Sequence, residues 1–557
     1  MLELFRFPGG VKPASHKQES AGSPIAPAPL PGRLVVPFRQ SATGAAAIQV
    51  QAGDKVLKGQ TIGAAEGAFG TAVHAPASGT VVAIEARTLP HPSGLAAPCA
   101  IIEPDGEERW IDRVPLDPLG DPESLRARIR DAGIVGLGGA AFPSHVKAKA
   151  AIDTLIVNGA ECEPWITCDD RLMRERAEEI VAGARILGRL MGAKRIVFGV
   201  EDNKPEAAQA LRAAMNECDG TSCQVAAVPT LYPAGGEKQL IRVLTGIAIP
   251  YGKLGPDFGV QCFNVGTAYA VARAVLHGEP LVSRIVTLAG NYATPGNFEV
   301  AIGTPIDALL PLGQPRADTD RVVMGGPMMG FPLPDLTVPL VKASNCLLAM
   351  SPALFPPPPP EMPCIRCGAC TRACPVVLQP HELYWFARSK NFGKAQEYHL
   401  FDCIECGCCA YVCPSRIPLV DYYRFAKSEI RARERDKAAA DRARERHEFR
   451  QFREEREKAE KAAKLAAKAA ETKAKLAQEE AAKASAGEAA PEKVSAGGTA
   501  PTDDKLALIA AAQARAAERK ATAAPRNTDA LTPDQQAQIA EAEARRAHAE
   551  AATKDDA

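Results

Sequence analysis

The sequence predicts a multidomain protein that combines β domains with an α/β domain, and three observations lead to this class. Residues 33–110 carry short apolar runs broken by Gly and Asp, a pattern typical of strands joined by turns. Residues 124–280 alternate helical and strand patterns, which favours an α/β arrangement. Residues 364–414 contain the pattern C-x2-C-x2-C-x3-C-P twice. The 557-residue chain has room for roughly three or four domains.

The first 30 residues are rich in Pro and Gly and read as an extended arm. In the strand-rich segment that follows, residues 74–82 read as a tight turn that leads into a half-buried strand. This pattern resembles the flattened barrel of biotinyl and lipoyl carrier domains, so we expect a barrel-sandwich domain. The lysine that a carrier presents for modification has no counterpart here. His74 is a candidate ligand, although a histidine beside a strand is more often structural.

A Gly-rich segment at residues 133–143 opens the α/β part. Four glycines within seven positions let the backbone approach a ligand closely and offer amides to a phosphate: Gly133, Gly136, Gly138 and Gly139. A structural turn explains the same glycines equally well. The spacing is not G-x-G-x-x-G after a strand, so it does not predict a Rossmann site.

Polar residues follow each of the strands predicted in this part. They occupy residues 158–164, 201–204, 232–238 and 264–267. Side chains at strand ends often line ligand sites in α/β folds. Ordinary exposed turns with helix caps are the alternative. The concentration of Gly, Asn and acidic residues at successive strand ends favours a ligand site.

Two further segments flank the cysteine motifs. Residues 281–345 read as a small β-rich unit, and the five prolines at 356–360 form a stiff spacer ahead of the motifs. From residue 428 the chain is dominated by Ala, Lys, Glu and Arg, which favour helix by propensity. The tail lacks an apolar a/d heptad, so it predicts an isolated helix or disorder, without a core or chemistry.

The cysteine spacing is that of bacterial ferredoxins with two [4Fe–4S] clusters. In such motifs three close thiolates bind one cluster, and the cysteine before the proline ligates the other cluster. A disulfide framework or a pair of zinc sites are the alternatives. Two full copies with the terminal proline favour clusters, and Cys408 breaks the spacing and is expected to be a non-ligand. The predicted ligands are Cys364, Cys367, Cys370 and Cys413 for one cluster, and Cys403, Cys406, Cys409 and Cys374 for the other.

Composition limits the remaining function classes. The 66 basic and 66 acidic residues cancel, which argues against a general nucleic-acid-binding protein. Eight of the 16 cysteines are assigned to clusters, and free thiols beside clusters indicate a reducing, cytoplasmic compartment. The N-terminus has no apolar run of signal-peptide length, and no stretch reaches the ~18 apolar residues of a spanning helix.

The order of these segments resembles the RnfC (RsxC) family, which belongs to the Rnf/Rsx ion-translocating electron-transport complexes of bacteria. The resemblance covers about residues 5–425 and rests on the Gly-Gly-Val-Lys-Pro start at Gly9, on residues 74–79, 133–147 and 232–237, and on the cysteine motifs. It implies five domains: an arm with a barrel-sandwich domain (1–115), an FMN- and NAD(H)-binding α/β domain (120–280), a soluble-ligand-binding β-grasp domain (281–345), a two-cluster ferredoxin domain (355–427) and the tail (428–557).

The α/β part also resembles the flavin- and NADH-binding subunit of respiratory complex I. The loop at 136–143 is similar to the FMN loop of that family, as are residues 158–164, 232–237 and 264–267. Three positions depart from the family pattern: Leu137, Ala160 and Gly236. The resemblance implies the following cofactor-binding residues: Gly136, Gly138, Gly139, Phe142, Lys147, Asn158, Glu161, Glu163, Tyr232, Gly235, Gly236, Glu237, Asn264 and Thr267.

The resemblance also implies a role for each group. The amides of residues 136–139 and Lys147 hold the FMN phosphate. The flavin is positioned by Asn158, Glu161, Tyr232 and Asn264. Phe142 stacks on the nicotinamide, and Glu163 or Glu237 contacts the nucleotide. No side chain is assigned to catalysis, because the cofactors carry the chemistry.

The implied function is a peripheral electron-transfer subunit of an ion-translocating ferredoxin:NAD+ oxidoreductase, at the cytoplasmic face of the bacterial inner membrane. Its partners are integral-membrane and other subunits of the complex, a ferredoxin-type or cluster-bearing electron partner, and NAD(H). A flavin-free ferredoxin-like adaptor is the main alternative. A second alternative is that the same complex keeps a redox-sensing transcription factor reduced. A scaffold that binds partners through its tail leaves the eight spaced cysteines unexplained.

Overall fold

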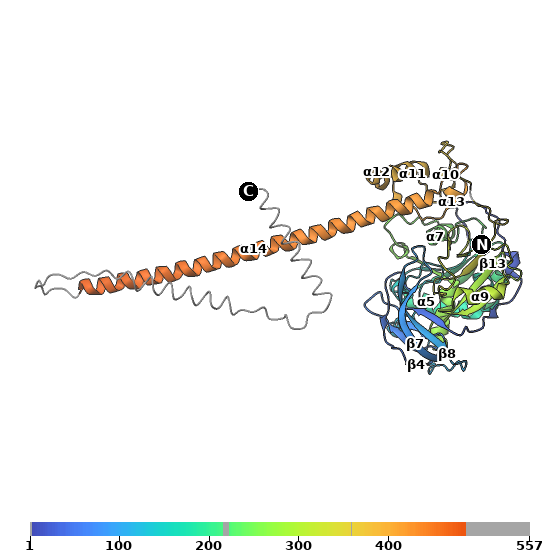
Figure 1. Cartoon of the computed structure of the whole chain (residues 1–557), viewed down its shortest axis with the longest axis horizontal. Helices are drawn as coiled ribbons and strands as arrows, with labels where there is room; N and C mark the ends of the chain where they lie inside the picture. Colours follow the sequence, from blue (N-terminus) through green and yellow to red (C-terminus); the bar gives the residue numbers. More distant parts are fainter. Residues whose placement is uncertain (1–2, 216–221, 358, 486–557) are drawn as a thin grey trace, which may run out of the picture. The chain divides into compact units, whose positions relative to one another are not determined.

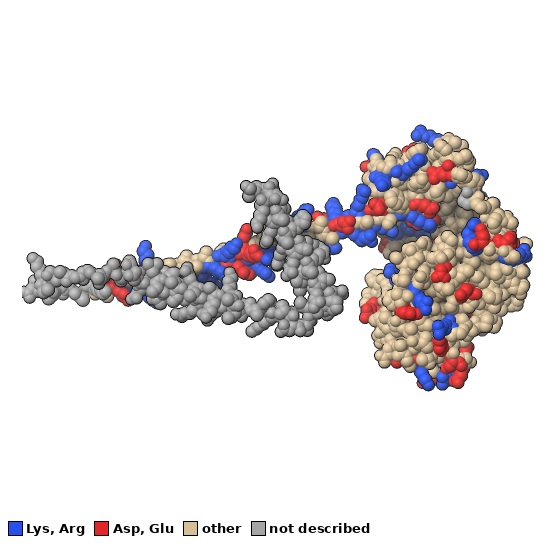
Figure 2. All heavy atoms as spheres, in the orientation of Figure 1, with Lys and Arg blue, Asp and Glu red and all other residues tan. Residues whose placement is uncertain are grey.

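The computed structural model describes residues 3–215, 222–357 and 359–485. The chain divides into two compact units, Met1–Arg444 and Glu445–Ala557. Figure 1 shows the elements of the first unit packed together, with the strands of the N-terminal domain in blue. On the visible face of this unit, basic and acidic side chains are interspersed (Figure 2), in keeping with the zero net charge.

The N-terminal domain is built from two small antiparallel sheets. One sheet has the order β2 (Leu34–Pro37), β8 (Ala96–Pro104), β7 (Gly79–Thr88), β4 (Lys55–Val56). The other has the order β3 (Ala47–Ile48), β5 (Thr61–Ala64), β6 (Val73–His74). Apolar side chains from both sheets, among them Val36, Val81 and Ile62, form one core. The two sheets therefore enclose one apolar core and form the predicted barrel-sandwich domain.

The α/β domain contains a parallel sheet with the order β11 (Ser222–Val228), β10 (Arg195–Glu201), β9 (Thr154–Gly159), β12 (Val260–Asn264). Strands β9 and β10 are largely apolar and buried, as expected for central strands of a parallel sheet covered on both faces, whereas the edge strand β11 is partly exposed. The accompanying helices are α2 (Pro122–Asp131), α3 (Ser144–Lys147), α4 (Cys168–Glu175), α5 (Ala177–Met191), α6 (Pro205–Ala214), α7 (Glu237–Thr245) and α8 (Val265–Leu276), with the 3-10 turn η1 (Gly255–Phe258). All four strands are parallel, so their carboxyl ends meet at one edge of the sheet.

The next domain has a six-stranded sheet with the order β1 (Ala26–Pro27), β14 (Gly296–Ala301), β13 (Ser283–Gly290), β17 (Cys346–Met350), β15 (Arg321–Met324), β16 (Phe331–Pro332). The first and last strands of the domain, β13 and β17, pair in parallel at the centre, and α9 (Ile306–Gly313) follows the β13–β14 hairpin. This arrangement is that of a β-grasp fold. The sheet extends to Met350, and the N-terminal arm, which also holds α1 (Gln18–Ala21), supplies its edge strand β1.

The cysteine segment folds as two short helices, each preceded by a glycine. Gly368 precedes α10 (Ala369–Ala373), and Gly407 precedes α13 (Cys408–Tyr411). Between them lie α11 (Pro380–Arg388), α12 (Phe392–Glu397) and η2 (Leu400–Asp402). The long helix α14 (Leu419–Ser485) begins in this domain, where Tyr423 and Ile430 belong to its core.

In the second unit, the described part of α14 carries exposed apolar side chains and local ion pairs. Phe449, Phe452, Leu465 and Leu476 are all exposed. Arg450 pairs with Glu454 at 2.9 Å, one turn apart. The sequence predicted an isolated helix or disorder for the tail; the described residues up to Ser485 are helical, and residues 486–557 lie outside the described residues. No helix in the described ranges is both long and apolar enough to span a membrane.

Candidate functional site: strand-end loops and two cysteine cavities

Two asparagines mark the carboxyl edge of the parallel sheet. Asn158 of β9 lies opposite Asn264 of β12 in the strand register. The Asn158 side-chain amide donates to the Gly235 carbonyl at 2.8 Å. The Asn264 side chain accepts from the Gly266 amide at 2.8 Å, which caps α8, and donates to Asp169 at 2.7 Å. The sheet therefore brings these predicted strand-end residues together, and their amides hold the neighbouring loops.

The Gly-rich loop is closed by a bridge between Val135 and Pro143. The Leu137 amide donates to the Thr267 hydroxyl at 3.0 Å, which fixes one side of the loop. Gly138, Gly139 and Ala140 are exposed, and no described residue accepts a hydrogen bond from their amides. A cradle of free backbone amides suits a phosphate group. This part of the site fits the phosphate of FMN.

The predicted phosphate lysine is paired with an acid. Lys147 ends α3, and its ammonium lies 2.6 Å from the carboxylate of Glu237, the first residue of α7. Both side chains are partly exposed, and the ammonium also lies 5.3 Å from the centre of the Phe263 ring. A phosphate at the Gly-rich loop would compete with Glu237 for Lys147. Gly236 lies between Gly235 and Glu237 in the chain and is the N-cap of α7. Its amide donates a hydrogen bond to the Pro233 carbonyl.

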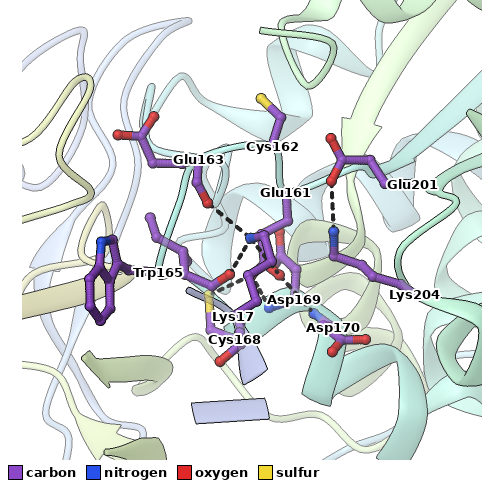
Figure 3. Close-up of polar contacts among 12 residues, drawn as sticks. Lys17, Glu161, Cys162, Glu163, Trp165, Cys168, Asp169, Asp170, Glu201 and Lys204 are labelled. Atoms are coloured by element: carbon purple, nitrogen blue, oxygen red, sulfur yellow. Dashed lines mark hydrogen bonds and ion pairs between the residues drawn. The ribbon is translucent and has the colours of Figure 1, made fainter. Parts of the chain in front are cut away.

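Glu161 lies in the loop between β9 and α4, in the buried polar cluster of Figure 3. Its carboxylate accepts from the amide of Asp169 at 2.7 Å, and the Lys17 ammonium lies 3.9 Å away. Burial raises the pKa of Glu161 and lowers the pKa of Lys17, and each charge opposes the shift of the other. A buried pair, Lys204 and Glu201 at 2.9 Å, lies in the same cluster. Glu161 thus holds its own loop in shape.

Glu163 is engaged by the β-grasp domain. Its carboxylate accepts from the backbone amides of Met328 at 2.7 Å and Met329 at 3.0 Å. Burial raises the pKa of the Glu163 carboxyl, and these two hydrogen bonds oppose that shift. Of the two acids predicted to contact the nucleotide, Glu237 is therefore the more accessible. Phe142, predicted to stack on the nicotinamide, is exposed at the end of the Gly-rich loop.

A cavity of about 580 Å³ lies at the junction of the barrel, α/β and β-grasp domains, beside the Gly-rich loop. It is lined in part by Leu137, Gly266 and Arg284. The buried Arg284 guanidinium donates to the Leu137 carbonyl at 3.0 Å and to the Ser344 carbonyl at 3.1 Å. Arg284 thereby ties the Gly-rich loop to the β-grasp domain.

The eight motif cysteines separate into two sets, each around its own small cavity. One cavity is lined by Cys364, Cys367, Cys370 and Cys413. The other is lined by Cys374, Cys403, Cys406 and Cys409. Each set takes three cysteines from one motif and one from the other, which is the crossed arrangement expected from the sequence. Cys408 lines neither cavity and is completely buried.

Tyr232 connects the α/β domain to the second cavity. Its hydroxyl is buried and donates to the carbonyl of Cys406 at 2.7 Å. The same residue pairs with Val11 of the N-terminal arm. The sequence singled out Tyr232 as a residue that positions flavin, and it gave no signal for the contact with Cys406.

The sequence also missed the part of the arm that enters this region. Lys17 donates to the carbonyl of Glu163 at 2.9 Å, although the two residues are 146 positions apart. No local pattern marks Lys17, whereas Gly9 and Gly10 stand out as consecutive glycines. His74, a candidate ligand in the sequence, is buried in the barrel domain. Its Nδ1 has no hydrogen-bond partner among the described residues.

Three family models match the chain. The model described as "RnfC Barrel sandwich hybrid domain" matches residues 5–107. "Nuo51 FMN-binding domain" matches residues 129–273, and "4Fe-4S dicluster domain" matches residues 363–417. These matches assign FMN and [4Fe–4S] clusters to the chain as cofactors, in agreement with the sequence interpretation.

Two relatives are each described as the C subunit of an "Ion-translocating oxidoreductase complex". The protein of Serratia proteamaculans is 47% identical over 410 residues, which are 72% of this chain and 57% of that protein. The protein of Yersinia pestis bv. Antiqua (strain Antiqua) is 46% identical over 453 residues, or 80% and 73% of the two chains. The chain thus spans little more than half of the Serratia protein. A chain of an NAD+-reducing [NiFe]-hydrogenase aligns over 49% of this chain and 54% of its own, with a TM-score of 0.40 and 22% identity, too distant to bear on function.

Proposed function

Since the chain belongs to the RnfC family, the C subunits of ion-translocating oxidoreductase complexes, we propose that it passes electrons between NAD(H), FMN and two [4Fe–4S] clusters within such a complex. The observation that carries this proposal is the contact between Tyr232 and Cys406, because it joins the strand-end loops directly to a cysteine cavity. FMN exchanges electrons in pairs with NAD(H) and singly with clusters, so it supplies the step between them.

The FMN phosphate is assigned to the Gly-rich loop. The amides of Gly138 and Gly139 would donate to it, Gly136 would shape the turn, and Lys147 would leave Glu237 to balance its charge. The free amides and the partly exposed lysine support this assignment. Thr267 acts indirectly, because its hydroxyl is occupied by the Leu137 amide.

The flavin ring is assigned to the edge of the sheet. Asn158 and Asn264 hold the loops that border it. Gly235 and Gly236 belong to the loop before α7, and a Cβ on Gly235 would lie 2.9 Å from the Cys162 sulfur. Glu161 fixes the β9–α4 loop from within. For the nucleotide, the exposure of Phe142 supports stacking on the nicotinamide. The exposure of the Glu237 carboxylate supports a contact with the nucleotide.

The two cysteine sets are the proposed cluster ligands. Their separation into two four-cysteine cavities supports one [4Fe–4S] cluster in each. Tyr232 touches only the set that contains Cys406, so the cluster of Cys374, Cys403, Cys406 and Cys409 is proposed as the one nearer the flavin. The thiolates bind iron, and the surrounding apolar residues keep water away.

The partners and the location follow from the family. We assign the chain to the cytoplasmic face of the bacterial inner membrane, bound to integral-membrane and other subunits of its complex. A ferredoxin-type or cluster-bearing protein is its electron partner. The description of the relatives as subunits of an ion-translocating complex supports this assignment.

Cofactor analysis of the anaerobically purified chain tests the proposal. We expect about one FMN and about eight irons per chain, and equilibrium reduction of both by NADH. Iron without flavin, even after FMN is supplied, would contradict it. In that case the chain is a flavin-free adaptor that relays electrons between partner proteins.

A further inference from the structure

The N-terminal arm lies between the α/β domain and the ferredoxin domain. The amide of Val11 donates to the Tyr232 carbonyl at 2.8 Å, and the amide of Tyr232 returns a bond to Val11 at 3.0 Å. One residue earlier, the amide of Gly10 donates to the carbonyl of Ala373 at 3.0 Å. Two adjacent residues of the arm are therefore bonded to the two domains.

Gly9 makes the closest approach between the arm and the ferredoxin domain. A Cβ at this position would lie 2.6 Å from the carbonyl oxygens of both Ala373 and Cys374. Gly9 also has a φ of +66°, in the left-handed region that favours glycine. Both obstructing atoms are backbone, so a larger residue at Gly9 would push the two domains apart.

Two cysteines of one cavity thus lie against the arm and the α/β domain. Cys374 is contacted through the arm at Gly9, and Cys406 through the hydroxyl of Tyr232. Val11, Tyr232 and Cys406 belong to one buried apolar cluster, together with Ala373 and Cys408. The arm fills the boundary between the domains at this cavity.

The loop that starts at Tyr232 continues to the predicted flavin site. The carbonyl of Gly235 accepts from the Asn158 side chain at 2.8 Å, and its amide donates to the Cys162 thiol at 3.2 Å. Asn158 and Cys162 stand at the end of β9 and in the loop after it. A short series of contacts therefore links the sheet edge, the Tyr232 loop, the arm and the cysteine cavity.

Further along the chain, the arm is bonded to the β9–α4 loop. The carbonyl of Ser15 accepts from the Trp165 amide at 2.8 Å, and the His16 ring stacks on Trp165 with centres 4.1 Å apart. The buried Lys17 ammonium donates to the Glu163 carbonyl at 2.9 Å (Figure 3). These contacts bind the arm to the β9–α4 loop, which borders the same predicted flavin site.

We propose that residues 9–11 set the spacing between the flavin site and the cluster of Cys374, Cys403, Cys406 and Cys409, and are positioning residues for electron transfer. This inference rests on the proposed function. Each transfer oxidises the reduced flavin by one electron and reduces the cluster by one electron, with flavin protons released to solvent. The arm takes no part in this chemistry and fixes the distance over which it occurs.

Two single-methyl variants of the arm test the proposal. Gly9→Ala places the Cβ against Ala373 and Cys374, whereas Gly22→Ala, the matched control, meets no described atom within 4 Å. Each is mixed rapidly with NADH under anaerobic conditions, and the rates of flavin and cluster bleaching are followed. We expect normal flavin bleaching in both variants and cluster reduction slowed severalfold in Gly9→Ala, because the rate of electron transfer falls steeply as the distance between flavin and cluster increases.

FMN content, iron content and cluster reduction potentials are measured on the same samples. With these unchanged, a slow cluster phase in Gly9→Ala alone supports the proposal, and equal rates in the two variants overturn it. If Gly9→Ala loses a cofactor, Val11→Ala decides, because it removes the packing of the arm against Tyr232 and Cys406 and adds no atom. Slow transfer in that variant supports the proposal, and wild-type transfer overturns it. If NADH fails to bleach the wild-type flavin, the proposed function is wrong, and photoreduction of the flavin then supplies the electrons for the same comparison.

Discussion

The Tyr232 hydroxyl donates a hydrogen bond of 2.7 Å to the carbonyl of Cys406, 174 residues further along the chain. Tyr232 is 3% exposed, and its burial raises the pKa of the phenol, so the hydroxyl stays protonated and remains a donor. Cys406 belongs to the cysteine set that surrounds one cavity, and Tyr232 begins the loop that reaches Asn158. This single bond places the loops of the α/β domain against a proposed cluster ligand.

Removal of this hydroxyl is expected to destabilise the protein. Tyr232→Phe leaves the buried carbonyl of Cys406 without its donor, which costs about 1–3 kcal/mol in the free energy of unfolding. Thermal unfolding of the intact chain under anaerobic conditions measures the effect. Tyr251→Phe is the control, because Tyr251 is 61% exposed. Equal midpoints for the two variants would show that the bond contributes nothing.

The cysteine sets predict which thiols hold iron. Cys367→Ala is expected to lose the cluster of its own set and to destabilise the neighbouring cluster, because each motif supplies a ligand to both. Cys408→Ala is the control within the same motifs and should keep about eight irons. Iron analysis and optical spectra of both variants check this. Near wild-type iron content in Cys367→Ala would contradict the assignment.

A negative charge placed at the Gly-rich loop is expected to weaken FMN binding. Ala140 is exposed beside the free amides of Gly138 and Gly139. Ala140→Glu places a negative charge there and should weaken FMN binding about tenfold, or about 1.4 kcal/mol. Ala140→Gln has nearly the same shape without the charge and should bind as the wild type does. Titration of the FMN-depleted protein with FMN measures the dissociation constants. Equal values for the two variants would exclude a phosphate at this loop.

The lowered pKa of His74 is expected to contribute to the loss of folding stability in acid. Burial, and next the charge of Lys342, lower the pKa of His74 from 6.5 to about 3. The unfolded chain therefore takes up a proton as the pH falls below about 6.5, whereas the folded chain does not until about pH 3. The contribution of His74 to the free energy of unfolding is fully present above pH 6.5. It falls between pH 6.5 and 3 by up to about 1.4 kcal/mol per pH unit. Unfolding of His74→Gln should depend less steeply on pH in this range. Parallel curves for variant and wild type would refute the effect.

The second unit should be dispensable for cofactor binding. Residues 445–482 are exposed, and the residues that line the two cysteine cavities all precede Arg444. A chain that ends at Arg444 is expected to keep its FMN and iron. Loss of either cofactor from this truncated chain would show that the tail supports the domains before it.

The parts of the fold that follow local rules could be predicted from the sequence. The apolar run before Asn158 indicated a buried strand, and the parallel sheet then brings Asn158 opposite Asn264. The cysteine spacing indicated the crossed sets because the geometry of the motif is local. The β-rich unit was recognised, but its last strand extends to Met350 and its edge strand β1 comes from the arm.

The contacts that the sequence did not reveal all join distant segments. Lys17 lies against a loop 146 residues away, and nothing in its neighbourhood distinguishes it from a surface lysine. The partner of the Tyr232 hydroxyl depends on how two domains pack, which no periodicity encodes. Two consecutive glycines at positions 9 and 10 were the single signal that the arm approaches another backbone closely.

Time-resolved reduction of the wild-type chain by NADH measures the proposed electron path from NAD(H) to the clusters. We expect the flavin to bleach first and the clusters to bleach afterwards, at a rate independent of NADH concentration. Clusters that are reduced without prior flavin bleaching, or that stay oxidised while the flavin is fully reduced, would contradict a path from NAD(H) through FMN to the cysteine cavities.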